Sequence, residues 1–161
     1  RVVSCTRDGT LRVWSPLASG DPLLVLEGHS SHINAVTAFV IADSEPRVVS
    51  CSNDNTLRVW NPLVGGDALL VLEGHSRDVN GMTTFVTADG DPRVVSCSSD
   101  TTLRVWNPLA GGTALPARKG HSYAVGGLTA FVSADGAPRV VSCTWDGTLR
   151  VWSPLASGDA L

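Results

Sequence analysis

Short apolar runs alternate with turn residues along the chain, and residues 47–60 show the pattern clearly. Residues 47–51 (RVVSC) are β-branched and small, and residues 56–60 (TLRVW) alternate between apolar and polar. Both patterns are typical of β-strands. Asp54 and Asn55 lie between the two runs and suit a tight two-residue connection. This stretch therefore predicts a β-hairpin.

Two further strands complete the local pattern. Residues 68–73 (ALLVLE) and residues 79–86 (VNGMTTFV) are apolar runs of strand length, and residues 74–76 (GHS) form a turn between them. The chain shows no 3.6-residue apolar periodicity, so the sequence predicts an all-β protein without helices.

The four-strand pattern recurs every 46 residues. The string RVVSC begins at residues 1, 47, 93 and 139, and TLRVW begins at residues 10, 56, 102 and 148. Fixed periods of this length indicate repeat architectures. The repeat divides a single domain, residues 1–161, into units 1–46, 47–92 and 93–138 and a half-unit 139–161.

These features together resemble the WD-repeat β-propeller family. Each unit has four short strands, a Gly-His pair enters the first strand (residues 28–29, 74–75 and 120–121), and a tryptophan ends the third. The family's Trp-Asp dipeptide is replaced by Trp-Ser or Trp-Asn. The resemblance implies blades of four antiparallel strands and a non-catalytic scaffold for protein–protein interaction.

One chain of three and a half units is expected to form an incomplete ring. Closed propellers have about four to eight blades. The chain starts at Arg1 rather than at a methionine, which predicts that it is a piece of a longer protein. The remaining blades would come from that parent chain or from a second copy.

Each complete set of repeated polar residues contains His, Ser, Asp and Trp at fixed offsets. The resemblance implies a hydrogen-bonded chain from Trp to Ser to His to Asp in each blade. The residues are His29, Ser50, Asp54 and Trp60; His75, Ser96, Asp100 and Trp106; and His121, Ser142, Asp146 and Trp152. A catalytic Ser-His-Asp site would need one cleft with an oxyanion hole, not the same residues in every unit. We therefore expect no enzyme activity.

Positions that differ between units are the candidates for partner binding. One such position precedes the turn aspartate, and others follow the Gly-His pair. The resemblance places both at the end of the blade that usually binds partners, and Trp, Tyr and Arg are enriched in interface hot spots. The candidates are Arg7, His32, Asn53, Arg77, Asp78, Tyr123 and Trp145.

The amino-acid composition argues against several classes of ligand. The net charge of −3 argues against nucleic-acid and anionic-membrane binding, which favour basic surfaces. The cysteines Cys5, Cys51, Cys97 and Cys143 lack the close spacing of metal sites, and no cofactor motif occurs. One cysteine per unit predicts small buried residues in a reducing, cytoplasmic setting.

We therefore expect a protein or peptide partner and no metal or cofactor. Two alternatives to an interaction scaffold remain at this stage. The first is a sensor or autoinhibitory WD-repeat array of a larger signalling NTPase. The second is a propeller lectin or enzyme. Arg118 and Lys119 also form a basic spot beside Pro116, where the outermost strand of the third unit is interrupted.

Overall fold

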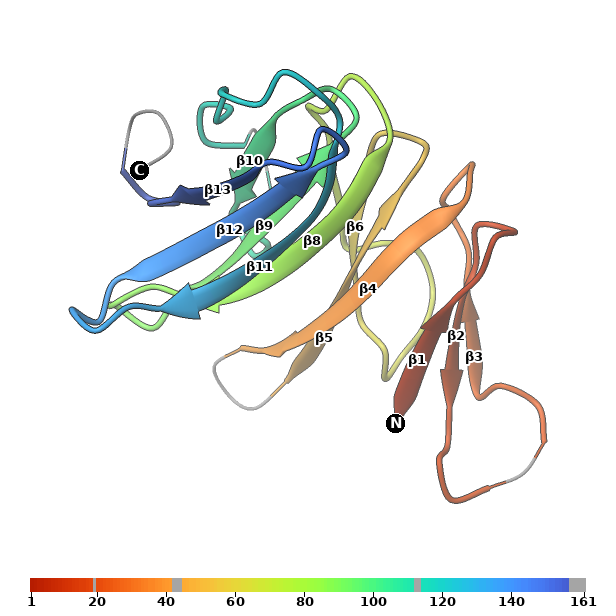
Figure 1. Ribbon diagram of the computed structural model, residues 1–161. Coiled ribbons are helices and arrows are strands. Elements are labelled where there is room, and N and C mark those ends of the chain that lie inside the picture. The colour runs from red at the N-terminus through yellow and green to blue at the C-terminus, as the bar shows by residue number, and fades with distance from the viewer. Residues whose placement is uncertain (19, 42–44, 112–113, 157–161) are drawn as a thin grey trace.

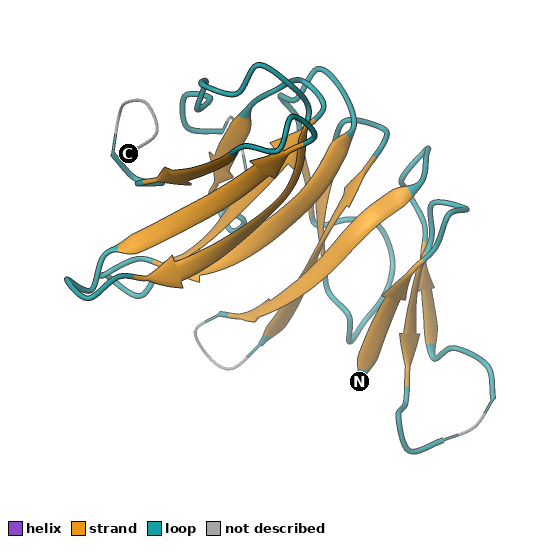
Figure 2. Cartoon of the chain, viewed as in Figure 1, coloured by secondary structure: helices purple, strands orange, loops and turns teal. Residues whose placement is uncertain are grey.

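A computed structural model describes residues 1–18, 20–41, 45–111 and 114–156. The described residues form strands, turns and loops and no helix (Figure 2). The strands build four antiparallel sheets that follow one another along the chain, with β1 and β13 at opposite ends of the row (Figure 1). The predicted all-β class and the incomplete propeller are confirmed.

Each sheet collects the strands of one repeat. Sheet 1 contains β1 (Val2–Cys5), β2 (Leu11–Trp14) and β3 (Leu24–Leu26). Sheet 2 contains β4 (Ile33–Val40), β5 (Pro46–Ser52), β6 (Leu57–Trp60) and β7 (Leu70–Leu72). Sheet 3 contains β8 (Val79–Val86), β9 (Pro92–Ser98) and β10 (Leu103–Trp106), and sheet 4 contains β11 (Val125–Val132), β12 (Pro138–Thr144) and β13 (Leu149–Trp152).

Tight turns set the register of the hairpins between the second and third strands. In sheet 2, Cys51 pairs with Leu57 and Val48 pairs with Trp60, and the same register recurs in the other sheets. Asn55 has a φ of 71° in this turn, in the left-handed region that asparagine tolerates better than most residues. Asn55 N–H donates to the Ser52 carbonyl at 3.2 Å, and Ser52 N–H donates to the Thr56 carbonyl at 3.2 Å. The turn therefore lies where it was predicted, but it has three residues, 53–55, rather than the predicted two.

The core lies between neighbouring sheets rather than within any one of them. Leu57 and Val59 of sheet 2 pack against Val94 and Trp106 of sheet 3. Equivalent clusters join sheet 1 to sheet 2 and sheet 3 to sheet 4. Side chains alternate between the two faces of each strand. One apolar face of a sheet therefore packs against the sheet that follows it along the chain, and its tryptophan packs against the sheet that precedes it.

The two end sheets each lack a strand that sheet 2 has. Among the described residues, sheet 1 begins with β1 and has no inner strand, and sheet 4 ends with β13 and has no outer strand. Leu149 is 71% exposed, although its equivalents Leu57 and Leu103 are at most 1% exposed. The fourth outer strand, expected to begin at residues 159–161, lies outside the described residues.

Within the part of sheet 3 that the structure describes, a single bridge between Leu103 and Arg118 stands where sheet 2 has its outer strand. This follows from Pro116, which cannot donate a backbone hydrogen bond. Arg118 is buried, and its guanidinium donates to the carbonyl of Pro154 in the next sheet at 3.1 Å. The expectation of a basic spot is therefore wrong for Arg118, because its side chain bridges two sheets.

Candidate functional site

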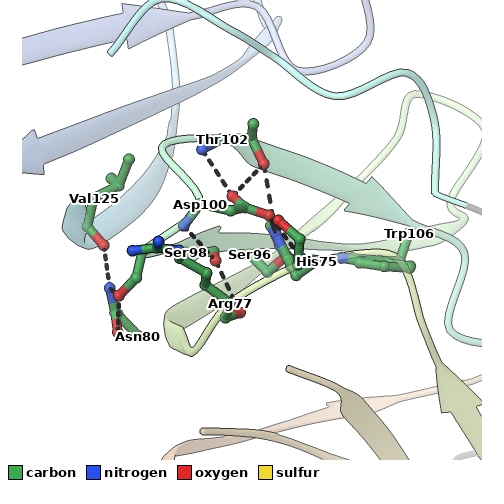
Figure 3. A network of polar contacts seen from close by, with 11 residues as sticks. His75, Arg77, Asn80, Ser96, Ser98, Asp100, Thr102, Trp106 and Val125 are labelled. Atoms are coloured by element: carbon green, nitrogen blue, oxygen red, sulfur yellow. Dashed lines mark hydrogen bonds and ion pairs between the residues drawn. The ribbon is translucent and has the colours of Figure 1, made fainter. Parts of the chain in front are cut away.

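The four repeated polar residues of sheet 3 form a continuous chain of hydrogen bonds (Figure 3). Trp106 Nε1–H donates to Ser96 Oγ at 2.8 Å, and Ser96 Oγ lies 2.7 Å from Nε2 of His75. Nδ1 of His75 lies 2.8 Å from Oδ2 of Asp100. These hydrogen bonds thus connect the turn before β8 to strands β9 and β10.

The donor and the acceptor of each hydrogen bond in this series can be assigned, because the Ser96 hydroxyl has a single proton. Because Ser96 Oγ accepts from Trp106, its own O–H is free to donate to His75 Nε2. Nδ1 of the neutral ring therefore carries the proton and donates it to Asp100. The same carboxylate oxygen accepts the backbone N–H of Ser76 at 3.1 Å.

The glycine before each histidine is required by close packing. A Cβ at Gly74 would lie 3.0 Å from the Arg104 guanidinium and 3.3 Å from the Trp106 ring, and its φ is 155°. The Trp106 ring in turn lies against His75, with ring centroids 6.0 Å apart. A side chain here would push the histidine turn away from the tryptophan.

Sheet 2 repeats this geometry with His29, Ser50, Asp54 and Trp60, at distances of 2.7–2.8 Å. Sheet 1 keeps only the bond from Trp14 Nε1–H to Ser4 Oγ, at 2.8 Å. It has no histidine turn among its described strands.

Sheet 4 has only part of the arrangement. His121 Nε2 and Trp152 both contact Ser142 Oγ at 2.7 Å. Nδ1 of His121, however, is buried without a hydrogen-bond partner among the described residues, because Asp146 turns toward Thr144 and Thr148. The expected bond between Asp146 and His121 is therefore absent.

The reason lies in the residue two positions before the aspartate. In sheet 3 this residue is Ser98, whose hydroxyl donates to the carbonyl of Arg77 and accepts the backbone N–H of Asp100. In sheet 4 it is Thr144, whose hydroxyl donates to the Asp146 carboxylate instead. Thr6 binds Asp8 in the same way in sheet 1.

Burial and hydrogen bonding set the protonation of these groups. Burial lowers the pKa of His75 below 6.5, and the hydrogen bond to Asp100 offsets only part of this effect. Burial alone raises the pKa of Asp100, but hydrogen bonds from Thr102 and His75 outweigh it and lower the pKa to about 2. At neutral pH the pair is therefore a neutral imidazole and a carboxylate.

We expect the free energy of unfolding to fall as the pH is lowered from about 7.5 to about 5. Burial lowers the pKa of His29, His75 and His121 in the folded chain, so the unfolded chain binds more protons below about pH 6.5. Their contribution is complete above that pH and is lost as the pH falls. Urea denaturation at several pH values measures it, and a stability that is constant or rises on acidification would contradict the assignment.

The candidate partner-binding residues lie at one end of the sheets. Arg7, Asn53 and Trp145 occupy the turns between second and third strands, and the others precede inner strands. Backbone bonds join the two groups, since Asn53 N–H donates to the His32 carbonyl at 2.9 Å and Ser99 N–H donates to that of Asp78 at 3.0 Å. The exposed candidates are Arg7, Arg77, Tyr123 and Trp145, and the half-buried ones are His32, Asn53 and Asp78.

Two asparagines at this end were not predicted from the sequence. Asn80 Nδ2 donates to Ser99 Oγ at 3.1 Å and to the carbonyl of Val125 in the next sheet at 2.8 Å. Asn34 makes the equivalent pair of contacts. The sequence feature that could have predicted them is an asparagine at the same repeat position in two otherwise apolar inner strands.

Sheet 4 replaces both members of this polar pair. Gly126 stands where Asn34 and Asn80 stand, and Trp145 stands where Asn53 and Ser99 stand. The indole lies over the glycine, since a Cβ at Gly126 would be 3.4 Å from Nε1 of Trp145. Even so, Trp145 is 83% exposed, so the contact covers little of the ring.

The geometry gives little support for a metal or redox site. The part of the chain that the structure describes has no group of three or more His, Cys, Asp or Glu side chains that could hold a metal ion. Burial raises the pKa of Cys51 to about 12, which leaves an unreactive thiol. The expectation of four buried cysteines is wrong for two of them: Cys143 is exposed and Cys5 is half-buried, because each lies in a sheet at an end of the row.

None of the described segments forms a helix long and apolar enough to cross a membrane.

Comparison with protein families identifies the repeat. The model described as WD domain, G-beta repeat matches residues 20–61, 66–107 and 113–153, which together cover most of the chain. The chain belongs to the WD-repeat family, whose domains are generally non-catalytic scaffolds for protein interaction. A search of curated proteins found no match.

Proposed function

We propose that the chain is a non-catalytic scaffold that binds a protein or peptide partner at the turn end of its sheets. The observation that carries the proposal is Trp145, a large aromatic side chain that is 83% exposed at a position occupied by small polar residues in sheets 2 and 3. Burying such a ring against a partner would release a large apolar area from water.

The environment of Trp145 supports a contact role over a packing role. Core tryptophans of this chain, such as Trp106 and Trp152, are at most 2% exposed and donate to a serine. Trp145 lies over Gly126 and lines a hollow together with Gly126, Cys143 and Thr144. Tyr123 belongs to the same sheet end and is 59% exposed. Interface hot spots are enriched in these residue types.

The repeated serine, histidine and aspartate support a structural role. Ser96 is fully buried, and its hydroxyl already accepts from Trp106 and contacts His75. A nucleophile needs access to substrate and a free base. The same groups recur in sheet 2 with the same contacts, as expected for a brace within each blade.

The setting and the rest of the ring are part of the proposal. We infer a reducing, cytoplasmic location from four cysteines that form no disulfide. We also infer that residues 1–161 act as one partial propeller, completed by blades of a longer parent chain or of a second copy. No nucleic acid or membrane is expected as a partner, given the net charge of −3.

The substitution Trp145→Ala tests the binding role. We expect partner affinity to fall at least about tenfold, since hot-spot truncations typically cost 2 kcal/mol or more. The free energy of unfolding should change by less than about 0.5 kcal/mol because the ring is exposed. The partner is first captured with the tagged chain and quantified. Its affinity for the parent chain and for the variant is then measured by titration.

Leu17→Ala is the matched control, because Leu17 is 97% exposed and follows β2 at the opposite end of sheet 1. An equal loss of partner in both variants would contradict the proposal. So would a large loss of stability in Trp145→Ala, which would make the ring a packing residue.

A further inference from the structure

A hollow lies between sheets 2 and 3, at the end of the sheets opposite to Trp145. Its volume is about 400 Å³, within the range of about 300–1,000 Å³ that ligand sites occupy. Its apolar lining comes from both sheets and includes Val59, Leu69, Leu70 and Leu109. Leu69 is 51% exposed and Leu109 is 47% exposed, so these two side chains lie at the mouth. We call this feature the 2–3 hollow.

The 2–3 hollow also has a hydrogen-bond acceptor, the carbonyl of Pro108. Pro108 lines the hollow, and its carbonyl accepts no hydrogen bond from the part of the chain that the structure describes. The next backbone donor along the chain is already used, because Leu109 N–H donates to Asn107 Oδ1 at 3.0 Å. The hollow therefore offers apolar walls and an acceptor, and a fitting ligand would supply a donor at the end of an apolar stem.

An arginine of the chain itself makes this contact at the next junction, between sheets 3 and 4. Arg118 stands at the repeat position of Leu72, and Pro154 stands at that of Pro108. The Arg118 side chain is buried, and its guanidinium donates to the Pro154 carbonyl at 3.1 Å. At the junction of sheets 2 and 3 the apolar Leu72 has no donor to offer. The equivalent carbonyl there is left for a donor from outside the chain.

Arg47, which also lines the 2–3 hollow, leaves room for a second guanidinium. Its own guanidinium donates to Glu45 Oε2 at 2.6 Å, so its charge is balanced and its donors are engaged. Arg93 occupies the same repeat position in sheet 3 and pairs with Asp91 at 3.3 Å in the same way. Arg118 is nevertheless seated at the junction that follows Arg93. An arginine paired with its own acid is thus compatible with another arginine in the junction.

We propose that the 2–3 hollow binds an arginine side chain of a protein or peptide partner, presented between apolar residues. The guanidinium donates to the Pro108 carbonyl, as Arg118 donates to Pro154. The arginine stem packs on Leu69 and Leu109, since long cationic side chains bury their methylene groups along apolar surface. This surface is separate from the Trp145 end of the sheets, and the proposal does not depend on a binding role for Trp145.

Arginine fits this site better than the other common side chains. A carboxylate would bring an acceptor to the Pro108 carbonyl, and the neighbouring Arg47 is already paired with Glu45. A purely apolar group would exclude water from the carbonyl without replacing its hydrogen bond, which is costly. Lysine is a more strongly hydrated point charge, whereas the guanidinium is weakly hydrated and has several donors in a fixed plane.

A labelled peptide with the sequence Gly-Ser-Leu-Arg-Leu-Ser-Gly tests the chemistry of the site. We expect saturable binding that shifts the methyl NMR signals of Leu69. The same peptide with citrulline, which keeps the shape of arginine but has no charge, should bind at least about tenfold more weakly, since charge-assisted hydrogen bonds are about twice as strong as neutral ones. No saturable binding of the arginine peptide, or equal affinity for both peptides, would overturn the proposal.

Two substitutions at one repeat position locate the site. Leu109 and Leu155 are 47% and 44% exposed, and they follow the equivalent residues Pro108 and Pro154. Leu109→Lys places a positive charge at the mouth and should weaken binding of the arginine peptide at least about fivefold by like-charge repulsion. Leu155→Lys is the matched control, because the junction beside it already holds Arg118. It should change the affinity less than about twofold, since distant surface charges are screened.

Both leucines are exposed, so both variants should fold like the parent chain. An equal loss of affinity in Leu109→Lys and Leu155→Lys, or no loss in Leu109→Lys, would overturn the placement in the 2–3 hollow. Trp145→Ala should leave binding of the arginine peptide unchanged. A loss in that variant equal to the loss in Leu109→Lys would place the peptide at the other end of the sheets and would also overturn the proposal.

Discussion

Truncating Leu103 to alanine is expected to lower the free energy of unfolding by about 2–5 kcal/mol, the usual cost of removing a fully buried leucine. Leu103 is 1% exposed and belongs to the cluster between sheets 3 and 4, with Val105, Val140 and Trp152. Because rigid strands surround the site on both sides, we expect it to collapse little. The loss should therefore include a cavity term as well as the transfer term.

Leu149→Ala is the control, since Leu149 occupies the same repeat position and is 71% exposed. It should change the stability of the monomer by less than about 0.5 kcal/mol. Urea denaturation of both variants at one low concentration compares them. Similar losses would show that the face of sheet 4 is covered in solution, contrary to the structure.

Replacing His75 by alanine should lower the free energy of unfolding by about 2–4 kcal/mol, because unpaired buried polar groups cost about 1–3 kcal/mol each. The change removes the acceptor of Ser96 and the donor to Asp100 together. The Ser76 N–H and Thr102 still bind Asp100, which limits the loss.

His121→Ala should cost less, about 1–2 kcal/mol, since His121 contacts Ser142 but not Asp146. Thermal or urea unfolding of the two variants gives the comparison. An equal loss in both would mean that the bond to the aspartate adds nothing to stability. No loss in His75→Ala would remove the case for a structural network.

The period of the sequence predicted most of the fold. Strand β8 has the predicted bounds, Val79–Val86, and β6 begins one residue after the predicted start at Thr56. The outer strand β7 is shorter than predicted, Leu70–Leu72 instead of residues 68–73. An edge strand pairs on one side only, so its ends are less strongly held than apolar pattern alone indicates.

Details of the site depended on contacts that a repeat cannot show. Thr144 and Ser98 are similar residues at the same offset, yet one binds the aspartate side chain and the other binds a carbonyl of the preceding turn. The burial of Arg118 likewise depends on Pro154, which is distant in sequence. A residue's position in the repeat predicts its strand, and its neighbours in space decide its partners.

The placement of the core has a consequence for how the molecule opens. Each apolar cluster joins only two adjacent sheets, so the chain behaves as a short linear array with nearest-neighbour coupling. Sheets 2 and 3 pack against a neighbouring sheet on both sides, whereas sheets 1 and 4 pack against a neighbour on one side only among the described residues. Amide hydrogen exchange should therefore be graded, with the terminal sheets fraying at lower free energy than the middle pair.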